Sequence, residues 1–265
     1  MMIWRPIWIG VLLATLSGNC FAHAFWLVPH KGLVSKDDLV AIDLRVGVSW
    51  PGERVGRLPG MIETFDLYDA QGKHAVKGRD GAAPVGHFRA GTPGTVVVAM
   101  LTHAQAITLP GVEFDKYLVE EGLDQVRSER QTLGIADAPG REQFLRCAKT
   151  LVRVNSDSAG FDRVVDLPLE LVAVTDPFQL KPGGRFKARL LREGKPVAGV
   201  LVRAWAKDDP KHEQQVRTDQ DGVVELTLEK TGLWFLSAVQ MHSVIEYQAD
   251  WESIWASLSF EIPTP

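Results

Sequence analysis

Cysteine is scarce in this sequence, with only Cys20 and Cys147 among 265 residues. Cys20 lies in an N-terminal segment that we expect to be removed, which leaves Cys147 without a partner for an internal disulfide bond. The fold must therefore be stabilised by its apolar core. We expect Cys147 to behave as a small buried apolar residue and not as a nucleophile.

An excess of positive charge is also missing. The sequence has 29 Lys and Arg residues against 33 Asp and Glu residues, a formal net charge of −4. Nucleic acids and anionic membrane surfaces attract strongly basic proteins or basic tracts. We therefore expect no nucleic-acid partner.

The common catalytic motifs do not occur. The sequence contains no G-x-S-x-G, H-E-x-x-H, phosphate-binding loop or Cys-x-x-Cys. Glu120 and Glu121 resemble a catalytic carboxylate pair, but adjacent positions on a helix point about 100° apart and cannot share a substrate. We expect that this protein is not an enzyme.

A long apolar run occurs only near the N-terminus. A single positive charge, Arg5, precedes an uncharged apolar run over residues 7–16, and small and polar residues follow it. This pattern is typical of a secretory signal peptide, and the run is too short for a bilayer core of about 30 Å. We expect a signal peptide over residues 1–22, cleavage after Ala22 with Ala24 as the alternative, and a periplasmic mature chain without a membrane span.

Alternating apolar and polar residues dominate the chain after the signal peptide. Residues 39–48 and 61–68 alternate with a period of two, and residues 95–101 form a β-branched run. Pro-Gly turns separate these segments. The sequence predicts an all-β protein built of β-sandwich domains, with a first β domain over residues 23–168. Its predicted core includes Val40, Ile42, Leu44 and Val46.

A small helical insertion is predicted within the first domain, at about residues 112–151. Phe114, Tyr117, Leu118 and Glu121 have the spacing of one helix face, and Gly122 is placed to end that helix. A second helix is predicted over residues 141–151, where Phe144, Cys147, Ala148 and Leu151 have the same spacing. The polar segment 124–140 between them is expected to be a mobile excursion.

The remainder, residues 169–265, is predicted to be an immunoglobulin-like or transthyretin-like β-sandwich. Short strands alternate with turn residues throughout this part of the chain. In the last strand, Ile254, Ala256, Leu258, Phe260 and Ile262 share one face, which we assign to the core together with Leu226. The opposite face carries Trp251 and Trp255, and we expect these to pack against the first domain.

Four segments together resemble a known family. They are His-Ala-Phe-Trp-Leu-Val-Pro at 23–29, Phe-Asp-Lys-Tyr-Leu-Val-Glu-Glu-Gly-Leu at 114–123, Ala-Lys-Thr-Leu at 148–151, and Asp-Trp-Glu-Ser-Ile-Trp-Ala-Ser-Leu-Ser-Phe at 250–260. In this order the chain resembles the DUF4198 family of exported proteins of unknown function. Members have been described as periplasmic components of cobalt or nickel uptake. The resemblance therefore implies a metal-uptake permease or an outer-membrane receptor as a partner.

Histidine residues are the candidate metal ligands. Cleavage after Ala22 would leave His23 with a free amine and an imidazole, a chelate suited to Cu(II), Ni(II) or Co(II), and the resemblance implies a His just after the cut. We predict that His103 and His242 complete the site, although Gln240 stands where the family often has a further His. The sequence thus predicts an exported protein that binds or delivers a transition metal. The alternative is an extracytoplasmic module that binds a protein or glycan without a metal.

Overall fold

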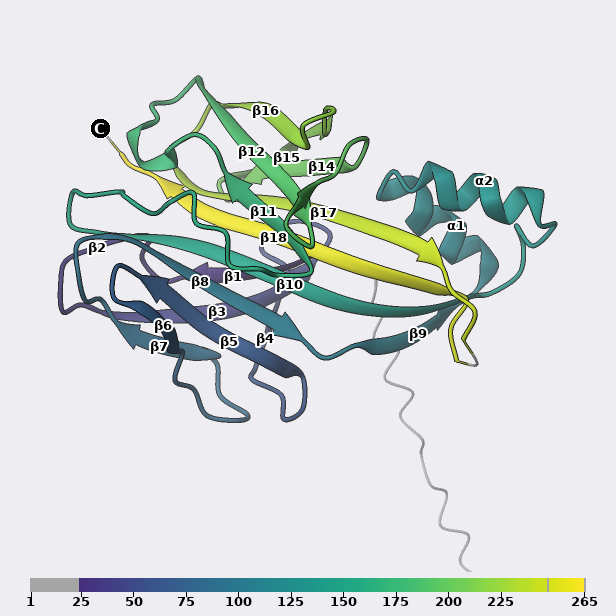
Figure 1. The fold of residues 1–265 in the computed structure, drawn as a ribbon, viewed down its shortest axis with the longest axis horizontal. Helices are drawn as coiled ribbons and strands as arrows, with labels where there is room; N and C mark the ends of the chain where they lie inside the picture. The colour runs from purple at the N-terminus through teal and green to yellow at the C-terminus, as the bar shows by residue number, and fades with distance from the viewer. Residues whose placement is uncertain (1–23, 247, 265) are drawn as a thin grey trace, which may run out of the picture.

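The computed structural model describes residues 24–246 and 248–264, so the predicted signal peptide and His23 lie outside the described residues. The described part consists mainly of β-strands, with helices α1 (Gly111–Glu120) and α2 (Asp124–Thr132) at one end (Figure 1). This confirms the predicted all-β class with a small helical part.

A ten-stranded sheet forms the middle layer of the molecule. Eight of its strands follow the order β15-β14-β17-β18-β10-β8-β5-β6, and β2 and β9 each pair with β10. The ten strands are β2 (Leu33–Val34), β5 (Ile62–Asp69), β6 (Gly72–Ala75), β8 (Gly94–Thr102), β9 (Gln105–Leu109), β10 (Gly140–Val154), β14 (Leu201–Ala206), β15 (Asp209–Arg217), β17 (Gly232–Ser243) and β18 (Trp251–Ile262).

The pairing of β10 with β18 joins the two halves of the sequence. These strands are parallel, in a register that places Glu142 beside Trp251 and Thr150 beside Ser259. The middle sheet therefore takes strands from both sides of residue 168. A domain boundary at that residue stays a prediction.

A second sheet covers one face of the middle sheet. It consists of β11 (Leu169–Ala173), β12 (Gly184–Arg192), β13 (Lys195–Pro196) and β16 (Val223–Leu228). The core between the two sheets contains Leu226, Ile254, Leu258 and Phe260, all buried as predicted. Cys147 is buried in the same core, which confirms its predicted environment.

A third sheet covers part of the opposite face (Figure 1). It consists of β1 (Ala24–Pro29), β3 (Leu39–Gly47), β4 (Glu53–Val55) and β7 (Gly86–Arg89). The predicted core residues Val40, Ile42, Leu44 and Val46 are buried between it and the middle sheet. Strand β1 is buried on both faces, because Phe25 packs in this core while Trp26 packs against Trp205 and Phe235.

The two helices cover the rest of that face. Phe114 and Tyr117 of α1 pack against Trp251 and Trp255, so the second face of β18 contacts the helices. Helix α1 ends where predicted, and Gly122 follows it at φ +64°, a conformation that glycine adopts at low cost.

Two local predictions are wrong. Residues 141–151 form strand β10, because both of its faces are covered: Phe144 and Ala148 point to one face, and Cys147 and Leu151 to the other. A strand buried on both faces has apolar residues at helical as well as strand spacing. Residues 124–132 of the predicted excursion form helix α2, which buries Val126 and Arg130.

No helix within the described ranges combines the length and apolar character needed to cross a membrane.

Candidate functional site

The predicted histidine ligands lie in different surroundings. His103 follows β8, is about half exposed and has Nδ1 3.8 Å from Glu63 Oε2. His242 lies on β17, is also half exposed and has Nε2 3.8 Å from Glu252 Oε1. Across residues 24–246 and 248–264, no three His, Cys, Asp or Glu side chains are grouped so that they could hold a metal ion. Because His23 lies outside these ranges, the three-histidine site stays a prediction.

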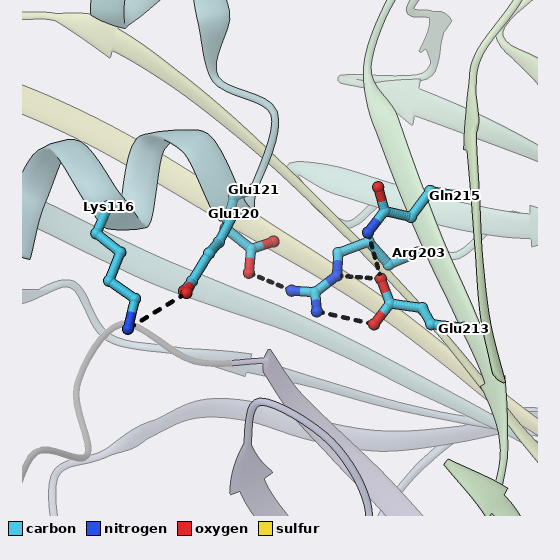
Figure 2. Close-up of polar contacts among 6 residues, drawn as sticks. All are labelled: Lys116, Glu120, Glu121, Arg203, Glu213 and Gln215. Atoms are coloured by element: carbon cyan, nitrogen blue, oxygen red, sulfur yellow. Dashed lines mark hydrogen bonds and ion pairs between the residues drawn. The ribbon is translucent and has the colours of Figure 1, made fainter. Parts of the chain in front are cut away.

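Glu120 and Glu121 have different partners. Glu120 lies 3.6 Å from Lys116 on the same helix, whereas Glu121 accepts a hydrogen bond of 2.5 Å from Arg203 on β14 (Figure 2). Their carboxylates therefore do not act as a pair, as expected from their adjacent positions on a helix.

Arg203 is the centre of a buried charged cluster. Its Nε and Nη2 donate to both carboxylate oxygens of Glu213, at 2.7 and 2.9 Å, and Gln215 donates to Glu213 at 2.9 Å (Figure 2). Burial raises the pKa of Glu121 to about 7, although the charge of Arg203 opposes this shift. The hydrogen bonds of this cluster link the end of α1 to strands β14 and β15. Since its guanidinium is occupied on two sides by carboxylates, we assign it a structural role.

A cleft beside β1 is the candidate binding site, which we call the Arg146 cleft. Its volume is about 450 Å³. Strands β1, β3, β4, β9 and β10 and the loop before β5 contribute its walls. The lining residues are Phe25, Val46, Glu53, Val55, Leu58, Pro59, Gly60, Met61, Gln105 and Arg146. Its walls are mainly apolar, and its size falls in the range of small-molecule sites.

Arg146 contacts two aromatic rings. Its guanidinium carbon lies 5.1 Å from the centroid of Phe25 and 4.6 Å from that of Phe144, and the residue is only 5% exposed. In such cation–π contacts the positive group is attracted to the face of the ring. The five N–H donors of Arg146 lie in the plane of the guanidinium group, which is the geometry that binds a carboxylate through two hydrogen bonds.

A buried carboxyl group lies two pleats away on the same face of β10. Glu142 accepts hydrogen bonds at Oε1 from Tyr117, at 3.1 Å, and from Ser253, while its Oε2 is buried without a hydrogen-bond partner in the described structure. Burial raises the pKa of Glu142 to about 7, against the opposing effects of Ser253, Tyr117 and the Arg146 charge. Near neutral pH this carboxyl is therefore partly protonated.

Neither Arg146 nor Glu142 was predicted as a site residue. The signal that could have identified them is a set of charged residues within an otherwise apolar segment: Glu142, Arg146 and Lys149 interrupt the run that contains Phe144, Cys147 and Ala148. In a helix with Phe144, Cys147 and Ala148 on one face, those charges would lie on the opposite face. In the strand that actually forms, all three are buried.

The model of one protein family, "Domain of unknown function (DUF4198)", matches residues 20–242. The chain belongs to the DUF4198 family. That description assigns no activity to DUF4198 proteins, so the family does not decide the function. No curated protein matches this sequence.

Solved structures with some likeness to this DUF4198 protein are distant. The D0-D1 domain of Intimin is 13% identical, with a TM-score of 0.21, over 89% of this chain and 97% of that one. Salmonella alpha-2-macroglobulin reacted with methylamine is 10% identical, with a TM-score of 0.22, over 92% and 15%. The BSP domain of Biofilm associated protein is 11% identical, with a TM-score of 0.19, over 89% and 30%. These scores are too low to support a conclusion about function.

Proposed function

We propose that this DUF4198 protein is an exported, non-catalytic binding protein, and that the Arg146 cleft binds a small organic anion with an apolar body. The observation that carries the proposal is the buried guanidinium of Arg146 in a mainly apolar cleft of about 450 Å³. Apolar pockets with one or a few placed polar groups are typical of small-molecule sites. Residues 1–22 supply the signal for export in this proposal.

Each part of the cleft has a role in this proposal. Leu58 and Met61 contact the apolar body of the ligand, and Arg146 donates hydrogen bonds to its carboxylate. The rings of Phe25 and Phe144 fix the guanidinium before the ligand arrives, so little side-chain freedom is lost on binding. The exposed Glu53, which also lines the cleft, disfavours ligands with more than one negative charge.

The test uses octanoate as the probe and calorimetric titration of the mature protein. We expect octanoate to bind and the neutral alcohol octanol to bind more weakly. Arg146→Met should weaken octanoate binding about tenfold to a hundredfold, since hydrogen bonds to charged groups contribute roughly 1.5–3 kcal/mol. Arg153→Met is the matched control, because Arg153 lies on the same strand and over an aromatic ring, Phe178, outside the cleft. Equal affinities of octanoate for the wild type and Arg146→Met would contradict the proposal.

Metal binding is the second candidate function, favoured by the position of the same cleft. Phe25, two residues after His23, lines it, and so does Met61, whose carbonyl oxygen accepts a hydrogen bond from the backbone N–H of His103 at 2.9 Å. The cleft thus brings together a sequence neighbour of His23 and the backbone hydrogen-bond partner of His103. The third predicted ligand, His242, pairs with Glu252 on β18, and neither residue lines the cleft.

The metal hypothesis is tested by titrating Cu(II) or Ni(II) into protein that begins at His23 and into protein with one extra Met before it. The extension moves the amine away from the imidazole, so affinity should fall sharply, and acid should weaken binding because both groups must lose protons. His103→Ala should weaken binding further, with His242→Ala as the comparison. Equal affinities of the two N-terminal forms would exclude the chelate.

A further inference from the structure

The Arg146 cleft is lined by a second charged residue, Glu53 on β4. Phe25 of β1 pairs with Val46 of β3, and Val46 pairs with Glu53, so the three residues form one row across their sheet. Residues directly opposite each other on neighbouring strands carry their side chains on the same face. Phe25 and Val46 pack in the core on that face, and all three residues line the cleft. The side chain of Glu53 therefore lies on the cleft side of this sheet.

The two charged groups lie at opposite ends of that row. The guanidinium carbon of Arg146 is 5.1 Å from the centroid of Phe25, at the first end. Glu53, at the other end, is two strands from Phe25, a separation of about 10 Å, because adjacent strands lie about 4.8 Å apart. The apolar side chain of Val46 lies in the middle of the row. A ligand that contacts both charged groups must therefore carry two charges with an apolar segment between them.

The two ends of the row differ in their access to water. Arg146 is 5% exposed, whereas Glu53 is an exposed residue. A buried guanidinium selects a carboxylate through its charge and its directed hydrogen bonds. An exposed carboxylate attracts an ammonium group more weakly, because water and salt screen the pair. Arg146 therefore supplies most of the affinity, and Glu53 decides which group is preferred at the far end of the ligand.

We infer that the Arg146 cleft binds a zwitterion, with its carboxylate on Arg146 and an ammonium group on Glu53; this inference rests on the function proposed above. The ligand has an apolar body with opposite charges at its two ends. An extended chain of eight bonds spans about 10 Å, which matches the separation between the two ends of the row. A second carboxylate in place of the ammonium group is repelled by Glu53.

The test uses three probes of equal chain length that differ only at the far end. Octanoate ends in a methyl group, 8-aminooctanoate in an ammonium group and octanedioate in a second carboxylate. Calorimetric titration of the mature protein should give the tightest binding for 8-aminooctanoate and the weakest for octanedioate. The expected preference for 8-aminooctanoate over octanoate is about twofold to fivefold, the contribution of an exposed ion pair. Without such a pair, replacing the apolar methyl group by ammonium should weaken binding.

Two substitutions of Glu53 test its role in this preference. Glu53→Gln should remove the preference for 8-aminooctanoate over octanoate. Glu53→Lys should reverse the order of the charged probes, so that octanedioate binds more tightly than 8-aminooctanoate. Glu63→Gln is the matched control, because it removes one negative charge from an exposed side chain that does not line the cleft. This control should keep the order of the three probes, and melting curves show that each variant folds.

The outcomes separate this inference from the proposed function. Octanoate binding that Arg146→Met weakens, together with an order of the probes that neither Glu53 variant changes, would overturn the inference and leave the proposed function intact. Absence of binding for all three probes would overturn both. A preference for 8-aminooctanoate that disappears in Glu53→Gln and reverses in Glu53→Lys supports the inference.

Discussion

Lys149 Nζ lies 2.6 Å from Glu170 Oε1, and both side chains are at most 2% exposed. The carboxylate of Glu170 also accepts hydrogen bonds from the backbone of Val165 and Leu167, and Lys149 donates to the carbonyl oxygen of Arg163. This ion pair therefore joins β10 to the segment that leads into β11. Removing one member would leave the other charge buried and unpaired.

The first prediction concerns this pair. Lys149→Met should lower the free energy of unfolding by about 3–5 kcal/mol, because it leaves the Glu170 carboxylate buried without its counter-ion. The double variant Lys149→Met/Glu170→Gln should be less destabilised than the single variant. Urea unfolding measures both. As control, Lys187→Met breaks an exposed pair with Glu225 and should lower the free energy of unfolding by less than about 1 kcal/mol. A Lys149→Met variant as stable as this control would contradict the prediction.

The second prediction concerns the pH dependence of stability. The pKa of Glu142 is raised from 4.5 to about 7 by burial, so between these values the folded protein holds a proton that the unfolded chain releases. The contribution of Glu142 to stability is thus fully present below pH 4.5 and is lost as the pH rises through 7. Glu142→Gln stays neutral at every pH. Its free energy of unfolding should therefore rise by about 1–3 kcal/mol relative to that of the wild type between pH 4.5 and 8.

Urea unfolding at several pH values measures this difference. Glu121 also has a pKa of about 7, but it is present in both proteins and its effect cancels in the comparison. Glu120→Gln, on the exposed side of α1, is the control. Its free energy of unfolding should differ from that of the wild type by the same amount at every pH. Parallel curves for Glu142→Gln and the wild type would mean that Glu142 titrates at its ordinary pKa in the folded protein.

The third prediction concerns the thiol of Cys147. Burial raises its pKa to about 12, and the side chain is enclosed in the core between two sheets. Reaction with a disulfide reagent at pH 8 should therefore require unfolding, and should be about a thousandfold slower in the folded protein than in urea. Absorbance of the released thiolate gives the rate. Rapid labelling of the folded protein would show that this core opens easily.

The fourth prediction concerns Leu258, which is completely buried on β18. Leu258→Asp should prevent folding, because it places an unpaired charge in the core. Leu258→Ala should instead lower the free energy of unfolding by about 2–5 kcal/mol. Thermal unfolding followed by circular dichroism checks both. Leu39→Asp is the control, since Leu39 is 64% exposed on β3. An unchanged melting temperature for Leu258→Asp would mean that the assigned faces of β18 are reversed.

Much of the β structure could be predicted from alternation. The segments 39–48, 61–68 and 95–101 correspond to β3, β5 and β8 within two residues. The two faces of β18 were assigned correctly, because only one of them carries a continuous row of apolar residues over 254–262. Helix α1 was found because one face is apolar and Gly122 follows it. In each case the local pattern and the tertiary environment agree.

Strand β10 shows where local pattern fails. Phe144 and Ala148 pack toward one face and Cys147 and Leu151 toward the other, so its sequence fits a helix as well as a strand. The Arg146 cleft could not be predicted for a related reason. Its residues come from six separate parts of the chain, and only the pairing of their strands brings Phe25, Met61 and Arg146 together.

The sequence by itself determined the all-β class, the faces of β18, the position of α1 and the buried state of Cys147, since each depends on the spacing of apolar residues along a few turns or pleats. Only the tertiary structure decided that β10 is a strand paired in parallel with β18, and that Arg146 lies buried in contact with Phe25 and Phe144. The physical reason is that burial on both faces removes the polar alternation that marks a strand. Which groups pair with a buried charge then depends on contacts between segments far apart in the chain.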